Sequence, residues 1–219
     1  MERKQIIEQI LQKKIIVIMR GMTREQLVHT VDAMYKGGIG LVEVTFDQSG
    51  KISDEVTAEN IRALTDTFEG RVLVGAGTVM SVEQVDLAYR AGAKYIISPD
   101  SCREVIERTV ELGMVSIPGV FTPTEAANAH RWGADFVKLF PNSEVSISYL
   151  KCLTVPLSHI RFLAVGGINA DNLADYLAAG AVGIGVATSI VNKRLIADGK
   201  YDEITQLALA HTKAADIEL

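Results

Sequence analysis

The sequence is short of several features that mark specialised classes of protein. It has only two cysteines in 219 residues, Cys102 and Cys152, and their separation matches no metal-binding or redox spacing. No apolar run reaches the roughly 18 residues that a membrane-spanning helix needs. Basic residues do not outnumber acidic ones, and the net charge is −5. These shortages argue against a disulfide scaffold, a membrane protein and a general binder of nucleic acid.

The chain also lacks the marks of export and of division into domains. The segment Met1–Lys14 is charged and helical in pattern, without the apolar stretch and small-residue cleavage site of a signal peptide. We therefore expect a cytoplasmic protein with reduced cysteines. No linker, low-complexity tract or long charge run interrupts the sequence, so we expect residues 1–219 to form one domain with a sizeable core.

What the sequence does contain is a repeated unit of amphipathic helix, small-residue turn and short apolar strand. Turn glycines such as Gly92, Gly133 and Gly180 each come just before a strand-like run, and neighbouring turns are about 20 residues or a multiple of it apart. The strands are expected at 15–20, 41–46, 72–78, 95–99, 115–119, 136–140, 161–166 and 181–186. Alternating strands and helices indicate a parallel sheet. Eight such units favour an α/β fold of the TIM (β/α)8-barrel type, with an extra N-terminal helix. A doubly wound open sheet is the alternative, but no G-x-G-x-x-G motif opens a helix after the first strand.

Active sites of such barrels lie at the carboxyl ends of the strands, so polar residues inside those apolar strands are the candidates. Side chains alternate across a strand, which places Phe136, Lys138 and Phe140 toward the barrel interior. An apolar interior lowers the pKa of a lysine and favours the free amine, which attacks ketones. The alternative is a structural lysine that reaches solvent or pairs with a carboxylate.

The same alternation points Glu43 inward from the second strand and Arg20 inward at the end of the first. Glu43 is a candidate general acid and base, or a structural partner of Lys138. Arg20 is a candidate carboxylate clamp, and its alternative role is a rim ion pair with Asp47 or Asp100.

Three further segments supply candidates for substrate binding. Thr78 offers a hydroxyl after a strand of small residues, although a plain tight turn is the alternative. Gly166 and Gly167 follow the seventh strand and Thr188 follows the eighth, which is where barrels of this type hold phosphate. The four histidines lie outside the strand ends, so we expect no metal site; a magnesium site at Asp47, Asp100 and Glu43 is a minor alternative.

The motifs that contain these residues resemble those of a known family. They are VIMRG (17–21), VEVTF (42–46), VGAGTV (74–79), IISPD (96–100), IPGV (117–120), FVKLFP (136–141) and VGGI (165–168). From about residue 10 to its end, the chain resembles bacterial 2-keto-3-deoxy-6-phosphogluconate (KDPG) aldolases. That group includes 4-hydroxy-2-oxoglutarate (KHG) aldolases and 6-phosphogalactonate-type enzymes.

The resemblance implies roles for individual residues. Lys138 matches the lysine that forms the Schiff base, and Glu43 matches the acid–base carboxylate. Thr78 matches a residue beside the pyruvyl group, whereas Gly166, Gly167 and Thr188 match the phosphate end. Pro99 and Phe140, inside two of the motifs, complete the candidate substrate contacts. The resemblance also implies a homotrimer that needs no metal or other cofactor.

The chain departs from the family pattern at two places. Asp47 stands where many members have an arginine, and Ala164-Val165 stands where many have Pro-Thr. Arg20 resembles the arginine that phosphogalactonate-type members use from the first strand.

We therefore expect a class I aldolase that cleaves a 2-keto-3-deoxy-6-phospho sugar acid, of the gluconate or galactonate type, to pyruvate and glyceraldehyde 3-phosphate. The nearest alternative is a KHG aldolase that yields pyruvate and glyoxylate. A phosphosugar isomerase or epimerase, and a non-catalytic sugar-phosphate-binding barrel, are the alternatives from other classes.

Overall fold

The fold is built on one parallel sheet whose strands all run in the same direction around a central axis. A computed structural model describes residues 1–217. Its strands are β1 (Ile15–Met19), β2 (Leu41–Thr45), β3 (Leu73–Gly77), β4 (Tyr95–Ile97), β5 (Val115–Ile117), β6 (Gly119–Val120), β7 (Val137–Leu139), β8 (Phe162–Val165) and β9 (Gly183–Val186).

The order of the strands brings the sheet back on itself. It runs β5-β4-β3-β2-β1-β9-β8-β7-β6, and every pairing is parallel. β5 pairs with β4 and β6 pairs with β7, and the two are separated only by Pro118. Since proline has no backbone N–H to donate, the fifth barrel position is divided there. The strands thus form a nearly closed barrel of eight positions.

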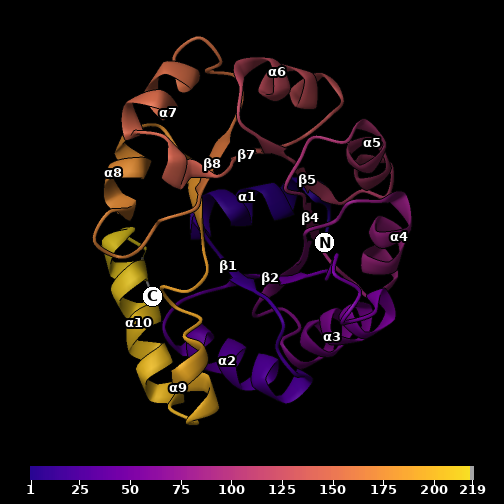
Figure 1. Cartoon of the computed structure of the whole chain (residues 1–219), viewed down its shortest axis with the longest axis vertical. Helices are drawn as coiled ribbons and strands as arrows, with labels where there is room; N and C mark the ends of the chain where they lie inside the picture. The colour runs from indigo at the N-terminus through magenta and orange to yellow at the C-terminus, as the bar shows by residue number, and fades with distance from the viewer. Residues whose placement is uncertain (218–219) are drawn as a thin grey trace.

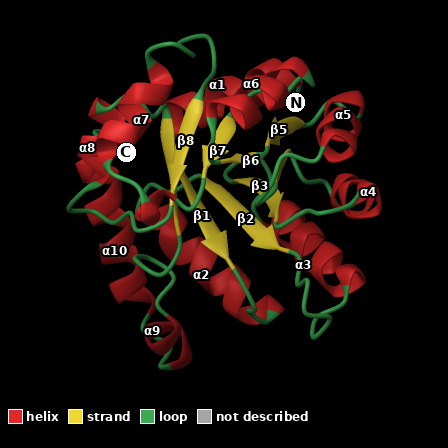
Figure 2. Ribbon diagram, turned by 45° about the horizontal axis from the view of Figure 1, so that its top comes forward, coloured by secondary structure: helices red, strands yellow, loops and turns green. Residues whose placement is uncertain are grey.

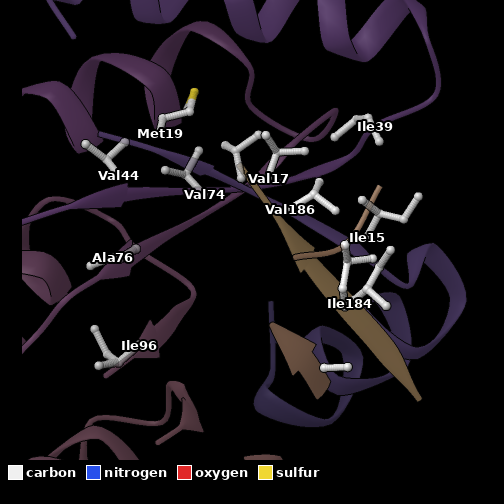
Figure 3. Packing of buried hydrophobic residues seen from close by; sticks show 14 of the residues in the cluster. Ile15, Val17, Met19, Ile39, Val44, Val74, Ala76, Ile96, Ile184 and Val186 are labelled. Carbon is white, nitrogen blue, oxygen red and sulfur yellow. The ribbon is translucent and has the colours of Figure 1, made fainter. Parts of the chain in front are cut away.

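Alternation along the strands sorts the buried side chains into two layers. Ile15, Val17 and Met19 belong to the large apolar layer between the sheet and the helices, which Figure 3 shows at close range. Ile16, from the same strand, belongs to a smaller cluster inside the barrel, together with Leu41, Leu73, Tyr95, Ile97, Val115, Ile117, Phe136 and Leu163. The predicted parity of the strands is therefore confirmed for β1 and β2.

Helices surround the barrel in a ring (Figures 1 and 2). Besides α1 (Arg3–Lys13), the helices are α2 (Arg24–Lys36), α3 (Asp54–Thr67), α4 (Val82–Arg90), α5 (Arg103–Glu111), α6 (Pro123–Arg131), α7 (Ile147–Thr154), α8 (Leu173–Ala178), α9 (Lys193–Ala197), α10 (Tyr201–Ala214) and the 3-10 turn η1 (Asn142–Glu144). Several begin at a side chain that accepts an otherwise unpaired N–H; Thr23, Ser53, Ser81 and Thr122 do so for α2, α3, α4 and α6.

Helix α1 stands apart from the ring and lies across one end of the barrel (Figure 1). Its Ile6 and Ile10 are buried against the interior cluster. The Arg3 guanidinium donates to Asp135 at 2.9 Å and to the carbonyl of Gly133 at 2.9 Å, which fixes the start of α1 to the loop before β7.

The predicted barrel with an additional N-terminal helix is confirmed. The expected strands all form, but most are shorter than expected by one or two residues at an end, and the one expected at 115–119 is divided. Within residues 1–217, no helix combines the length and apolar character that a membrane crossing requires.

Candidate active site

A lysine and a glutamate share the interior of the barrel. Lys138 on β7 is 8% exposed and Glu43 on β2 is 2% exposed. Both line a narrow cavity of about 10 Å³, whose other walls are the apolar or small residues Ile16, Ile18, Ile97, Ile117, Leu163, Val165 and Gly185. In residues 1–217 neither forms a salt bridge, and Oε2 of Glu43 has no hydrogen-bond partner. The structural alternative, a direct ion pair between them, is therefore absent from the described chain.

Burial shifts both groups toward their neutral forms. Loss of solvation lowers the pKa of Lys138 and nearby Arg20 lowers it further, while Glu43 acts in the opposite direction. Burial also raises the pKa of Glu43 to about 6, although Lys138 and Arg20 favour its ionised form. An amine and a carboxyl group with pKa values moved toward neutrality are suited to nucleophilic attack and to proton transfer.

The glycines of β3 give these interior side chains their room. A Cβ atom on Gly77 would lie 2.6 Å from Oε1 of Glu43, and one on Gly75 would lie 2.1 Å from the ring of Tyr95. Tyr95 is buried below the site and donates its hydroxyl to the carbonyl of Val42 at 2.6 Å. Side chains at these two positions would therefore displace the carboxylate or the ring beneath it.

Arg20 and Thr78 meet at the rim. Arg20 follows β1, and its Nη2 donates to the hydroxyl of Thr78 at 3.2 Å. Arg20 is exposed, yet close enough to influence the ionisation of both Lys138 and Glu43. The alternative ion pair with Asp47 or Asp100 does not form among the described residues. A guanidinium beside a hydroxyl at this position is a suitable binding group for a carboxylate.

Asp47 serves the loop that it begins. Its carboxylate accepts from the Ser49 hydroxyl at 2.7 Å and from the backbone N–H groups of Ser49, Lys51 and Ile52 at 2.9–3.1 Å. These hydrogen bonds lower the pKa of Asp47 to about 2. In residues 1–217, no group of three or more His, Cys, Asp or Glu residues is arranged to hold a metal ion.

Two turns at the same end of the barrel present unpaired backbone donors. Gly166 and Gly167 follow β8 with φ angles of 113° and 71°, which side chains other than glycine rarely adopt. Thr188 is exposed in the turn after β9. In the described chain, the backbone N–H groups of Gly167, Thr188 and Ser189 donate to no protein acceptor. Such groups bind anions well.

A buried histidine supports the second of these turns. Nδ1 of His211, on α10, lies 2.7 Å from the carbonyl of Leu207, so this nitrogen carries the hydrogen. Burial lowers the pKa of His211. In the neutral ring, Nε2 is therefore an acceptor, and the Ser189 hydroxyl donates to it at 3.1 Å.

Pro99 and Phe140 lie at the margin of the site. Pro99 follows β4 and packs against β6, where a Cβ on Gly119 would lie 2.2 Å from its carbonyl oxygen. Alternation predicts an interior Phe140, but this residue is 37% exposed. The reason is that β7 ends at Leu139, so parity no longer governs the next residue. The Phe140 ring centre is 4.6 Å from Nζ of Lys138, so the ring borders the approach to the amine.

Sequence reasoning did not identify four residues that support the candidate site. They are Tyr95, His211, and Gln48 and Gln84, which hydrogen-bond to the backbone at Thr78 and Met80. Gln84 and His211 lie on helices and contact the loop side chains of Gln48 and Ser189, which are distant in sequence, and periodicity does not reveal such contacts. A signal existed for Tyr95, because a large side chain in an interior position requires a small neighbour, and Gly75 on the adjacent strand provides it.

Comparison with known proteins agrees with this geometry. Residues 6–207 match the family model described as "Aldolase: KDPG and KHG aldolase". The chain is 35% identical over 201 residues to 2-dehydro-3-deoxy-6-phosphogalactonate aldolase of Escherichia coli K12, covering 91% of this chain and 93% of that protein. It is 32% identical to a 2-dehydro-3-deoxy-phosphogluconate aldolase of Treponema pallidum, covering 93% and 94%.

Solved structures give the same result. A native KDPGal structure is 35% identical and superposes with a TM-score of 0.82, covering 92% of this chain and 94% of that one. A KDPG aldolase from Legionella pneumophila, with pyruvate captured as a covalent carbinolamine intermediate, is 26% identical with a TM-score of 0.84, covering 96% and 98%. The chain therefore belongs to the KDPG and KHG aldolase family of class I pyruvate aldolases.

Proposed function

We propose that this protein cleaves a 2-keto-3-deoxy-6-phospho sugar acid, of the galactonate or gluconate type, to pyruvate and glyceraldehyde 3-phosphate, with Lys138 as nucleophile. The observation that carries the proposal is the buried amine of Lys138 in one apolar cavity with Glu43. A lysine held toward its neutral form has the free electron pair that attack on a ketone requires.

The reaction follows from these two groups. The Lys138 amine adds to the C2 ketone to form a carbinolamine, and Glu43 donates the proton with which the hydroxyl leaves as water, giving an iminium ion. Glu43, now ionised, accepts the proton of the C4 hydroxyl as the C3–C4 bond breaks and its electrons pass into the iminium, forming an enamine and an aldehyde. Protonation of the enamine and hydrolysis release pyruvate and restore the amine. The cavity of about 10 Å³ is at the lower limit of what holds one water molecule, and both Lys138 and Glu43 line it, which supports a proton relay through water.

The carboxylate end and the phosphate end of the substrate are proposed to bind different residues at the rim. Arg20 and Thr78 are the proposed contacts of the pyruvyl carboxylate, with Pro99 and Phe140 beside them. The backbone N–H groups of Gly167 and Thr188, which have no acceptor among residues 1–217, are the proposed donors to the phosphate. Gly166, with a φ angle of 113°, gives the first of these turns its conformation. Similarity to a 6-phosphogalactonate aldolase supports a phosphorylated substrate.

Borohydride trapping tests the proposed chemistry. Reduction in the presence of pyruvate is expected to add a reduced pyruvyl group to Lys138, which peptide mass spectrometry locates. Lys138→Met is expected to lose both the adduct and the aldolase activity. No adduct, or an adduct only on other lysines, would contradict the Schiff-base mechanism, and retained activity in Lys138→Met would favour an isomerase or epimerase.

A side-by-side assay tests the substrate. The two 2-keto-3-deoxy-6-phospho sugar acids are expected to be cleaved with a higher kcat/KM than 4-hydroxy-2-oxoglutarate, because the latter leaves the phosphate donors unpaired. A preference for 4-hydroxy-2-oxoglutarate would assign the KHG activity instead.

We also propose a cytoplasmic homotrimer that needs no cofactor. Sedimentation is therefore expected to give three times the 23.8 kDa chain mass.

A further inference from the structure

The loop that follows β2 is organised to present one side chain to the rim. The Asp47 carboxylate accepts hydrogen bonds from the backbone N–H groups of Ser49, Lys51 and Ile52, so the loop folds around this side chain. The next residue, Gln48, extends from this loop, and its Nε2 donates to the carbonyl oxygen of Thr78 at 2.9 Å. An exposed glutamine thus reaches the backbone of a proposed substrate contact.

A second glutamine holds the same segment from below. Gln84, on α4, is buried, and its Oε1 accepts from the backbone N–H of Met80 at 2.8 Å and from Nε2 of Gln48 at 3.3 Å. Its own Nε2 donates to the Asp54 carboxylate at 3.1 Å. We call Gln48, Gln84 and Asp54 the rim network. It joins the start of α3 to the two peptide groups that follow Thr78, at the Thr78 carbonyl and at the Met80 N–H.

Thr78 needs such support because of its backbone. Its φ angle is +54°, and a left-handed conformation is uncommon for a β-branched residue. In this conformation the hydroxyl of Thr78 meets Nη2 of Arg20 at 3.2 Å. Hydrogen bonds to the carbonyl of Thr78 and from the N–H of Met80 hold the two peptide groups that follow Thr78.

We propose that Gln48 and Gln84 are positioning residues that hold Thr78 in its left-handed conformation against Arg20, and that they thereby set the affinity of the site for the carboxylate of a 2-keto acid. This inference rests on the proposed function, because it takes Arg20 and Thr78 as the contacts of the pyruvyl carboxylate. The inference also assigns a role to Asp47, because the loop that Asp47 holds together places Gln48 at the rim.

The test measures how Lys138 trapping by borohydride depends on pyruvate concentration. This readout reports the pyruvyl end alone, because no aldehyde or phosphate takes part. Gln48→Glu keeps the shape but removes the donor to Thr78, and Gln48→Met removes all polarity. Both are expected to raise the half-saturating pyruvate concentration about tenfold, the effect of one lost hydrogen bond to a fixed acceptor. The yield of adduct at saturation and kcat are expected to stay within about twofold.

Matched variants separate positioning from general damage. Gln206→Glu makes the same change at an exposed site on α10 and is expected to behave as the wild type. Asp47→Ala is expected to raise half-saturation as the Gln48 variants do, whereas Asp47→Asn keeps an accepting oxygen and is expected to restore most of the affinity. Gln84→Met extends the series if its melting temperature shows that it folds.

The outcomes are distinguishable from those of the proposed function. An adduct in the wild type with half-saturation unchanged in both Gln48 variants overturns the positioning role and leaves the Schiff-base chemistry intact. An equal rise in Gln206→Glu also overturns it. No adduct in the wild type at any pyruvate concentration overturns both.

Discussion

At the scale of single residues, the candidate site contains two ionisable groups whose pKa values burial shifts toward favouring the uncharged forms. Lys138 and Glu43 share one cavity without a direct salt bridge in the described chain. Burial lowers the pKa of the first and raises that of the second. Each still favours the charged form of the other, so removing either charge is expected to shift its partner further toward neutrality. Burial of these two groups therefore costs stability, and it favours the uncharged forms that the proposed reaction requires.

Glu43→Gln tests directly whether the buried Glu43 carboxylate costs stability. The pKa of Glu43 is about 6 in the folded protein, against an ordinary value of 4.5. A raised pKa means that stability is fully present below the ordinary value and is lost as the pH rises through about 6. The variant does not ionise, so relative to wild type it is expected to gain about 2 kcal/mol in free energy of unfolding between about pH 4 and pH 7. Aldolase activity is expected to fall by at least about 100-fold.

Urea unfolding at several pH values measures this difference. Glu69→Gln, at an exposed position with no side-chain hydrogen bond in residues 1–217, is the control, and its difference from wild type is expected to stay flat. A flat difference for Glu43→Gln as well would contradict the assignment of a raised pKa to Glu43.

The burial of Lys138 and Glu43 in one interior site could be predicted from the sequence because parity within a strand is a strong constraint. Lys138 and Glu43 are charged residues at inward positions within apolar strands, and the structure buries both. The role of Asp47 could not be predicted in the same way. Its partners are the backbone N–H groups of the residues that follow it, and these become donors only once the loop has its conformation.

At the scale of elements, β3 shows how one strand serves both packing and chemistry. Gly75 and Gly77 lie at alternate positions and face the interior, one against Tyr95 and the other against Glu43. Tyr95 is buried and hydrogen-bonded to the carbonyl of Val42, so its ring has little freedom to move. By contrast, Oε2 of Glu43 has no hydrogen-bond partner among residues 1–217.

Two alanine substitutions on β3 are therefore expected to have different effects. Gly75→Ala places a methyl group 2.1 Å from the Tyr95 ring and is expected to cost about 3 kcal/mol or more of stability. Gly77→Ala places one 2.6 Å from Oε1 of Glu43, and this carboxylate is able to turn away. Its main effect is expected on kcat/KM, about 100-fold, because the acid–base group is displaced. Thermal melting and steady-state kinetics on both variants check this. Equal losses of stability in the two, or full activity in Gly77→Ala, would argue against the division.

The existence and order of the elements were predictable, whereas some of their ends were not. The recurrence of turn glycines before apolar runs identifies each βα unit, and all the expected strands form. The break between β5 and β6 depends on Pro118, whose missing N–H interrupts the pairing with the neighbouring strands. The pattern of apolar residues, from which the strand was predicted, carries no information on the loss of one backbone hydrogen-bond donor.

At the scale of the whole molecule, the two ends of the barrel have different tasks. The carboxyl ends of the strands carry Lys138, Arg20 and Thr78, whereas α1 covers the opposite end (Figure 1). Ile6 and Ile10 pack into the interior cluster, and Arg3 binds Asp135, which also accepts from the N–H of Ser116 at 3.0 Å. Substitutions at this end are therefore expected to change stability and leave the chemistry unaffected.

Ile10→Ala tests this separation, since Ile10 on α1 is fully buried and packs into the interior cluster. The substitution is expected to cost about 2–5 kcal/mol of stability, because it removes buried apolar atoms and leaves a cavity against the interior cluster. At a temperature where the variant is folded, kcat and the half-saturating pyruvate concentration are expected to remain within about twofold of wild type. Lys4→Ala, at an exposed position of α1, is the control for stability. If the layer beneath the cavity instead transmits the defect to Lys138, kcat falls at temperatures well below the melting point, and α1 must then be counted as part of the support of the active site.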